Sequence, residues 1–200
     1  MIIGLTGNIG SGKSSVAAYL SELGAKVVDT DQVARQIVAP GSPALAELIA
    51  AFGPGILNPD GTLNRAKMAS IVFNSPGARQ TLNKITHPRI RAEVNRHIDD
   101  HRRQSGAPAL VIEAPLLIEA GFHHLVDEIW LVAADEETML RRVARRDNTN
   151  LEQAAGRLAS QMPQSEKIPL AHRVIDNNGA PEDFKRQVDR LWYTVVVQSK

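Results

Sequence analysis

Residues 7–14 read Gly-Asn-Ile-Gly-Ser-Gly-Lys-Ser and fit the pattern G-x-x-x-x-G-K-S at every fixed position. An apolar run at residues 2–6 precedes this segment, and residues 15–23 follow it with apolar side chains at a helical spacing. A strand, a glycine-rich loop and a helix in this order form the context in which the pattern binds a nucleoside triphosphate. A second strand-like run at residues 26–29 completes a strand–helix–strand unit. The sequence therefore predicts an α/β protein of the P-loop class, with a parallel sheet flanked by helices.

The residue types of this segment, called the phosphate loop below, suit the chemistry of phosphate binding. Glycines let the backbone approach the phosphates closely, and successive N–H groups at a helix N-terminus bind the anion. Lys13 supplies a positive charge for the β- and γ-phosphates, and the Ser14 hydroxyl is a ligand for Mg²⁺. We therefore expect a nucleoside triphosphate at residues Gly7, Asn8, Ile9, Gly10, Ser11, Gly12, Lys13, Ser14 and Ser15, with Mg²⁺ at Ser14. The alternative is a glycine-rich turn that binds nothing.

Composition excludes several other classes of function. The 200 residues carry a formal net charge of +1, whereas nucleic-acid binding normally needs a basic face. The sequence has no cysteine, so disulfide scaffolds and cysteine-based metal sites are excluded. The most apolar stretch, residues 107–122, is broken by Glu113, Pro115 and Glu119, and residues 1–3 do not resemble a signal peptide. We expect a cytoplasmic protein without a membrane, nucleic-acid or obligate protein partner.

The rest of the chain alternates between strand signals and helical segments. Residues 30–104 contain many Pro and Gly residues, which predicts short helices and turns inserted between the second and third strands. Further strands are predicted at 109–113, 128–133 and 173–176. We expect Asp135 to cap a helix that runs to Arg146, and Asn150 to cap another that ends at Pro163, with Gln153 at its capping-box position. A closing helix is predicted at residues 181–197.

Two well-known nucleotide-binding alternatives lack their motifs. The guanine-reading pattern Asn-Lys-x-Asp has its nearest match at residues 83–86, which lack the aspartate. Motor-type ATPases carry an apolar strand that ends in Asp-Glu, whereas the strand at 110–112 is followed by Glu113, Ala114 and Pro115. A small-molecule kinase fits the small size and the helical insert better.

Two carboxylates, Asp29 and Asp31, follow the second predicted strand. Ligands of open α/β sheets bind at the carboxyl ends of the strands, so both side chains are expected on the side of the phosphate loop. A carboxylate there can accept a proton from an attacking hydroxyl or order water on Mg²⁺. The alternative is that Thr30 or Asp31 caps the following helix.

Four arginines lie on the helix predicted after Asp135: Arg141, Arg142, Arg145 and Arg146. Arg141 and Arg145 share one face, and Arg142 and Arg146 share another. Arginines on a movable lid can stabilise the charge of a transferring phosphoryl group and exclude water. The alternative is a solvated basic face.

The chain resembles the dephospho-CoA kinase family over nearly its whole length. The matching segments, in the order of the family, are residues 6–14, 29–31 with 33–35, 85–88 (Ile-Thr-His-Pro), 115–119 (Pro-Leu-Leu-Ile-Glu), 157–162 (Arg-Leu-Ala-Ser-Gln-Met) and 174–179 (Val-Ile-Asp-Asn-Asn-Gly). The resemblance implies an ATP-dependent kinase, a phosphotransferase with an alcohol acceptor. Its reaction is transfer of the ATP γ-phosphoryl group to the ribose 3′-hydroxyl of dephospho-CoA, giving CoA and ADP as the last step of CoA synthesis.

The resemblance also implies three parts and their site residues. The parts are a nucleotide core (1–30, 105–135 and 170–200), a helical CoA-binding insert (31–104) and a lid (136–169). By position, Asp31 matches the family's general base, Arg141 and Arg145 match its lid, and Asn177 matches the loop near the adenine. The substrate-binding set matches Asp29, Asp31, Arg35, His87, Leu116, Leu117, Ile118 and Glu119. The family commonly has an aspartate where this chain has Glu113, which can still order Mg²⁺ through water.

Plainer interpretations of these segments stay open at this point. His87-Pro88 can be a helix break, and Leu116 to Ile118 can be core residues. Three other functions are weighed against the family reaction: a kinase of a nucleoside or sugar acid, a non-catalytic ATP sensor, and nucleic-acid binding through the arginines.

Overall fold

The computed structural model describes residues 1–103 and 106–198, and the chain divides into two compact units. One unit contains Met1–Asp29 and Ile98–Lys200, and the other contains Thr30–His97. The predicted boundary between residues 104 and 105, and the predicted end of the core at residue 200, lie outside the described residues. The two units are described separately below.

The first unit is built on a five-stranded parallel sheet in the order β2-β3-β1-β4-β5. The strands are β1 (Ile2–Thr6), β2 (Lys26–Asp29), β3 (Leu110–Glu113), β4 (Glu128–Ala133) and β5 (Arg173–Asp176). Every residue of the central strand β1 is buried, as expected for a parallel sheet with both faces covered. All five strands predicted from the sequence are confirmed, since β3 differs only in beginning one residue later.

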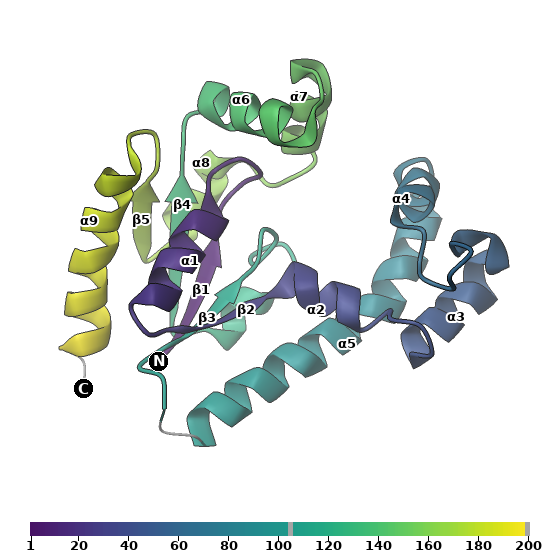
Figure 1. Ribbon diagram of the computed structural model, residues 1–200, viewed down its shortest axis with the longest axis horizontal. Helices are drawn as coiled ribbons and strands as arrows, with labels where there is room; N and C mark the ends of the chain where they lie inside the picture. The colour runs from purple at the N-terminus through teal and green to yellow at the C-terminus, as the bar shows by residue number, and fades with distance from the viewer. Residues whose placement is uncertain (104–105, 199–200) are drawn as a thin grey trace. The chain divides into compact units, whose positions relative to one another are not determined.

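Helices α1 (Lys13–Glu22) and α9 (Pro181–Leu191) cover one face of the sheet (Figure 1). Their buried side chains, including Leu20 and Val188, share a core cluster with residues from β1, β3, β4 and β5. The predicted closing helix continues past α9 as η4 (Trp192–Val197) in π-helical geometry, and Trp192 packs into the same cluster.

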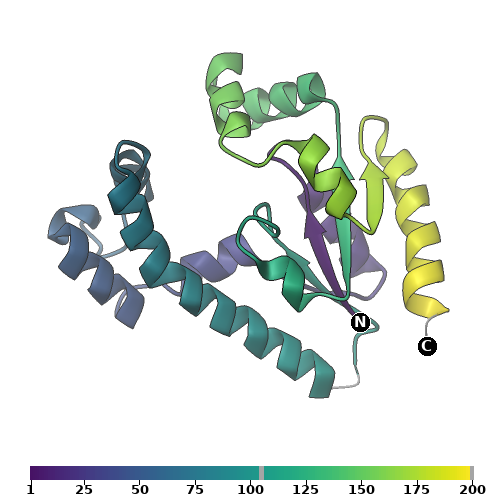
Figure 2. The same ribbon diagram turned by 180° about the vertical axis from the view of Figure 1, so that it is seen from behind.

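The segment between β3 and β4, with its helical turn η2 (Phe122–Leu125), and helix α8 (Gln164–Lys167) with η3 (Ile168–Leu170) lie on the other face (Figure 2). Close packing there requires a glycine in the central strand. A Cβ on Gly4 would lie 2.7 Å from Leu117 Cδ2 and 3.1 Å from Val126 Cγ2. The segment that contains Leu117 is therefore held tightly against β1.

Helices α6 (Glu136–Asp147) and α7 (Leu151–Ala159) follow β4, and their ends differ in part from the prediction. Asn150 Oδ1 accepts a hydrogen bond from Gln153 N at 2.8 Å, so the predicted cap is confirmed. The amide oxygen of Gln153 instead accepts from the Thr149 hydroxyl, which removes it from the predicted capping box. Helix α7 ends four residues before Pro163.

The prediction that the Asp135 side chain caps α6 is wrong. In the described part of the chain Asp135 occupies the N-cap position without a side-chain capping bond, and its N–H donates to Asn178 Oδ1 at 2.7 Å. Two acidic residues in the first turn, Glu136 and Glu137, suit the positive end of the helix dipole instead.

The second unit is helical and has a small core of its own. It contains α2 (Thr30–Gln36), α3 (Pro43–Phe52), η1 (Pro54–Ile56), α4 (Arg65–Phe73) and α5 (Pro76–Arg103) as far as His97. Its core cluster consists of Val38, Ala44, Leu48, Ile56 and Met68. Ser42 and Asn64 cap α3 and α4 through their side-chain oxygens.

The expectation that proline divides this whole region into short helices is wrong for α5, which has 28 residues and runs through Pro88. Proline removes one helical N–H and disturbs the carbonyls of the preceding turn. The carbonyl that loses its usual N–H partner through Pro88 is that of Lys84, and the Arg89 guanidinium donates to the next carbonyl along, that of Ile85, at 2.6 Å. Although α5 is long, it is highly charged, and among the described residues no helix has the length and apolarity needed to cross a membrane.

Candidate active site

The phosphate loop lies between the carboxyl end of β1 and the N-terminus of α1, as predicted. Gly10 and Gly12 have φ values of 81° and 90°, which favour glycine. There is also no room for a side chain at either position, because a Cβ on Gly10 would collide with the Met139 carbonyl and one on Gly12 would collide with Asn177 Nδ2. The pattern of glycines is therefore explained by backbone conformation and by close packing against α6 and the loop after β5.

Lys13 and Ser14 begin helix α1 beside the end of strand β3. The Lys13 side chain is buried, and its Nζ lies 3.5 Å from the Asn8 carbonyl across the loop. The exposed Ser14 hydroxyl donates to Glu113 Oε1 at 2.9 Å. Glu113 is in register with Asp29 of the neighbouring strand, so a hydroxyl and two carboxylates meet at the same edge of the sheet.

These oxygen donors are of the type that Mg²⁺ prefers. Within residues 1–103 and 106–198, no group of three or more His, Cys, Asp or Glu side chains could hold a metal ion on protein ligands alone. The Ser14–Glu113 pair fits a Mg²⁺ that takes most of its remaining ligands from phosphates and water, as is usual for this ion.

The far side of the loop is held by Asn177. Asn177 is buried, and its Nδ2 donates to the Ser11 carbonyl at 2.7 Å. Its backbone N–H donates to the Ala133 carbonyl at 2.8 Å, which fixes the loop after β5 against the end of β4. The side chain thus lies directly beside the loop that binds phosphate.

Among the α6 arginines, the structure places Arg142 beside the phosphate loop, with Nη1 3.5 Å from the Ser11 carbonyl. Arg141 points elsewhere and pairs with Glu137 at 3.5 Å, and Arg145 is exposed. Arg146 pairs with Asp147 at 2.7 Å, and this hydrogen bond lowers the pKa of the Asp147 carboxyl. The two predicted faces of the helix exist, but sequence spacing alone does not tell which face meets the loop.

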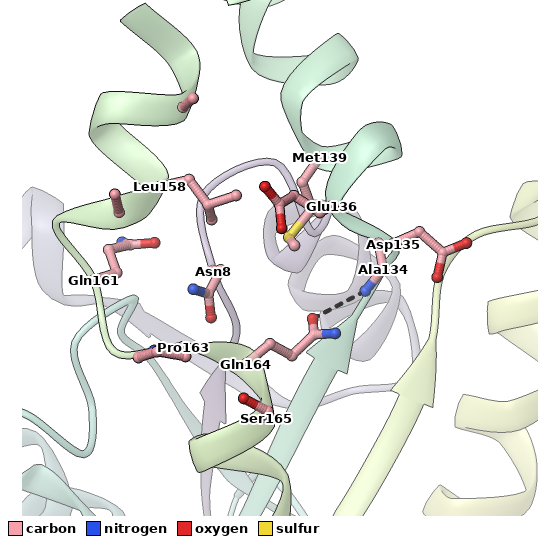
Figure 3. Close-up of a pocket in the computed structure, with 12 residues that line it drawn as sticks. Asn8, Ala134, Asp135, Glu136, Met139, Leu158, Gln161, Pro163, Gln164 and Ser165 are labelled. Carbon is pink, nitrogen blue, oxygen red and sulfur yellow. Dashed lines mark hydrogen bonds between the residues drawn. The ribbon is translucent and has the colours of Figure 1, made fainter. Parts of the chain in front are cut away.

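A pocket of about 690 Å³ opens beside the start of the loop (Figure 3). Its lining combines Asn8 with residues from the start of α6, the end of α7 and α8: Ala134, Asp135, Glu136, Met139, Ala155, Leu158, Ala159, Gln161, Pro163, Gln164 and Ser165. Asn8 is 2% exposed, and among the described residues its Oδ1 has no hydrogen-bond partner. Since a buried acceptor without a partner is costly, the pocket favours a group that can donate to it.

The predicted acceptor segment after β3 has a mixed environment. Leu117 and Ile118 are buried in the first unit, and Leu116 is 45% exposed. The Glu119 side chain is 22% exposed and pairs with Lys167 Nζ at 2.9 Å. Leu117 and Ile118 thus fit the alternative of core residues, and Leu116 is open to solvent.

The remaining predicted substrate residues belong to the second unit. Helix α2 begins at Thr30, so Asp31 lies in its first turn, where the residue is exposed. Asp31 shares a helix face with Arg35, four residues later. The pKa of Arg65 is lowered, first by burial and then by the charge of Arg35, and Asp31 opposes this shift. Asp31 and two arginines are therefore neighbours, a group that sequence reasoning recognised only in part. His87 is exposed on α5.

A second pocket, of about 290 Å³, lies within this unit. Its lining is mainly apolar: Ala34, Val38, Leu63, Arg65, Met68, Ala69, Val72, Leu82, Thr86 and Ile90. Arg65 is its charged member, so the pocket suits a ligand that joins an apolar arm to an anionic group.

Comparison with known sequences gives one consistent result. A family model described as dephospho-CoA kinase matches residues 1–183. The dephospho-CoA kinase of Geobacter sulfurreducens is 49% identical over 191 residues, covering 96% of each chain. That of Moorella thermoacetica is 48% identical, covering 96% of this chain and 90% of its own.

Solved structures agree with the sequence matches. The protein TT1252 from Thermus thermophilus has a TM-score of 0.83 at 35% identity, covering 98% of this chain and 97% of its own. Dephospho-CoA kinase from Campylobacter jejuni has a TM-score of 0.75 at 26% identity, covering 100% of this chain and 98% of its own. Shikimate kinase from Acinetobacter baumannii shares the fold, with a TM-score of 0.54 at 15% identity over 98% of this chain and 93% of its own.

Proposed function

The chain belongs to the dephospho-CoA kinase family, an ATP-dependent kinase family, and from this premise we propose how its residues perform the reaction. The acceptor is the ribose 3′-hydroxyl of dephospho-CoA, and the products are CoA and ADP. The observation that carries the assignment to these residues is the complete phosphate loop, whose Ser14 hydroxyl meets Glu113 at the carboxyl end of β3.

The phosphate loop holds the nucleotide. Backbone N–H groups of residues 7–15 bind the phosphates at the N-terminus of α1, and Lys13 neutralises charge that develops on the β- and γ-oxygens. Asn177 keeps the loop in shape from the adenine side through its bond to Ser11. Most of the rate acceleration then comes from positioning and from fixed charges.

Mg²⁺ is part of this proposal. Ser14 would hold the ion directly, and Glu113 and Asp29 would orient its water ligands. When bound, the ion lowers the negative charge of the phosphate oxygens. Glutamate at position 113 reaches one methylene further than the aspartate common in the family, and its 2.9 Å contact with Ser14 shows that its carboxylate reaches the loop.

The transfer is a direct in-line displacement. The 3′-oxygen forms a bond to the γ-phosphorus, while the bond from that phosphorus to the β–γ bridging oxygen breaks and leaves ADP. Asp31 accepts the hydroxyl proton or orients the hydroxyl. The lid arginines Arg141, Arg142 and Arg145 stabilise the transferring group, with Arg142 foremost because it already contacts the loop.

In this proposal the insert binds the acceptor, and the lid closes over the nucleotide. Residues 31–104 bind the acceptor, with Arg35 and His87 contributing to its recognition. The apolar pocket near Arg65 accommodates the extended arm of dephospho-CoA. Residues 115–119 form the floor of the acceptor site, where Leu116 is open to solvent. Residues 136–169 act as a lid over the nucleotide core, which comprises residues 1–30, 105–135 and 170–200.

The test is ADP release from ATP and Mg²⁺, measured with dephospho-CoA and, separately, with adenosine, AMP and gluconate. We expect ADP release that depends on dephospho-CoA, with CoA as the second product by mass spectrometry. Turnover of another acceptor alone would reject dephospho-CoA as the substrate. Tight ATP binding without ADP release from any acceptor would reject catalysis.

A further inference from the structure

A buried lysine lies on the sheet face opposite α1 and α9, outside the catalytic residues proposed above. Lys167, in α8, has a fully buried side chain. Its Nζ pairs with Glu119 Oε1 at 2.9 Å and donates to the Pro115 carbonyl at 3.0 Å. Lysine is almost never fully buried unless it is paired, because removing its charge from water is costly. The position therefore calls for an explanation beyond solubility or surface charge.

The partners of Lys167 lead to the phosphate loop in two directions. On one side, Glu119 Oε1 also accepts from Met162 N at 3.2 Å, and the Met162 carbonyl accepts from Asn8 Nδ2 at 3.0 Å. The adjacent Gln161 Oε1 accepts from Ile9 N at 2.8 Å. Two successive residues of the loop are thus held by the segment that follows α7.

On the other side, the Pro115 carbonyl accepts from Thr6 Oγ1 at 3.4 Å as well as from Lys167. Thr6 is buried and is the last residue of β1, directly before the loop. The contacts therefore close into a ring, which we call the Lys167 ring: Lys167, Glu119, Met162, Gln161, Ile9, Asn8, Thr6 and Pro115. Figure 3 shows Asn8 and Gln161 of this ring at the edge of the larger pocket.

We infer that Lys167 is a positioning residue that holds the start of the phosphate loop in register with the segment 115–119. In the proposed function, on which this inference rests, the loop carries the γ-phosphate and that segment forms the floor of the acceptor site. The buried ammonium bonds the Glu119 carboxylate and the Pro115 carbonyl at once, so it fixes the 115–119 segment to α8. In this inference Glu119 supports the floor of the acceptor site through Lys167. The residue of segment 115–119 that contacts the substrate is the exposed Leu116.

The test separates the effect of Lys167 on folding stability, measured by Tm, from its effect on the position of the phosphate loop relative to segment 115–119, measured by kcat. Lys167→Met leaves the Glu119 carboxylate without its ion-pair partner and the Pro115 carbonyl without its lysine donor, and it should lower Tm. The double variant Lys167→Met with Glu119→Leu removes both charges at similar volume, which is often neutral for stability. We expect its Tm to return most of the way to the wild-type value, while kcat stays about 100-fold lower and KM for ATP changes less than about threefold. Arg173→Met, which removes an exposed ion pair to Glu128, is the matched control and should keep wild-type kcat.

A double variant with both restored Tm and wild-type kcat would overturn the inference, because Lys167 would then serve stability alone. If the double variant does not fold, Gln161→Ala opens the same ring at a half-buried, uncharged position and should lower kcat about 10-fold; unchanged kcat there would overturn it equally. In the combined triple variant the two effects should not multiply, since both open one ring. Wild-type protein without turnover would instead reject the proposed function, so the two failures are distinguishable.

Discussion

Around the phosphate loop, polar side chains are buried, and those of Asn8, Lys13 and Asn177 donate hydrogen bonds, whereas the pocket of the Thr30–His97 unit is lined mainly by apolar side chains. Asn8, Ser11, Lys13 and Asn177 are each less than 9% exposed. Val38 and Met68 are buried just as deeply in the other unit, but they contribute packing alone. Preorganised charges act on the transition state, while an apolar pocket binds substrate and transition state alike. Changes in the first region should therefore lower kcat by orders of magnitude, and changes in the second should raise KM modestly.

The largest effect is expected from Lys13→Ala. This change removes the charge that neutralises the β- and γ-oxygens, so kcat should fall at least about 1000-fold. The variant should stay folded at the assay temperature, and its Tm checks this. Kinetics of dephospho-CoA-dependent ADP release and thermal unfolding measure the two quantities. Near-normal kcat would show that the loop is not the catalytic centre.

The second prediction compares two arginines of one helix. Arg142→Ala should lower kcat about 100-fold, because this guanidinium lies beside the Ser11 carbonyl of the loop. Arg141→Ala is the matched control, since Arg141 is 64% exposed in its side chain and pairs with Glu137. We expect the loss for Arg141 to be smaller by at least about 10-fold. An equal or larger loss for Arg141→Ala would show that lid closure, and not the contact seen here, selects the catalytic arginine.

The arginines also show how far sequence reasoning reaches in this protein. The repeat of four residues indicated that Arg141 and Arg145 share one face and Arg142 and Arg146 another. Which face meets the loop depends on how α6 packs against Gly10, and that contact joins residues 129 positions apart, between Gly10 and Met139. Local spacing carries no information about such a contact, so the arginine beside the loop was not singled out.

The strands and the phosphate loop were predictable for the opposite reason. Each strand contains a short apolar run, and the loop motif is contiguous in the sequence. Helix α5 was missed because Pro88 is normally a strong helix-ending signal, whereas the helix runs through it here. Lys167 had no recognisable signal, because its burial arises from partners about 50 residues away.

The third prediction concerns the apolar pocket of the second unit. Ala69, on α4, lines this pocket and is itself exposed, so Ala69→Trp should fill the pocket without disturbing the core. We expect KM for dephospho-CoA to rise about 10-fold, with kcat and KM for ATP changed less than about twofold. Ala66→Trp is the matched control, since Ala66 is exposed on the same helix and is not part of the pocket lining. Equal effects of both variants, or a fall in kcat alone, would contradict a binding role for the pocket.

The smallest effect is expected from His101, a histidine of the first unit that lines neither pocket. Burial lowers the pKa of His101, with further contributions from the Met1 amino group and Lys26, and Asp127 and a hydrogen bond to the Met1 backbone oppose them. In the unfolded chain the pKa returns to about 6.5, so the unfolded state binds more protons below that pH. His101 therefore contributes to stability above pH 6.5 or so, and this contribution is lost as the pH falls further. We expect the fall in Tm between pH 8 and pH 5.5 to be smaller in His101→Gln than in the wild type, with kcat at pH 8 unchanged. An equal fall in both proteins would show that the folded and unfolded states bind this proton alike. A change in kcat at pH 8 would show that the last turn of α5 affects catalysis as well as stability.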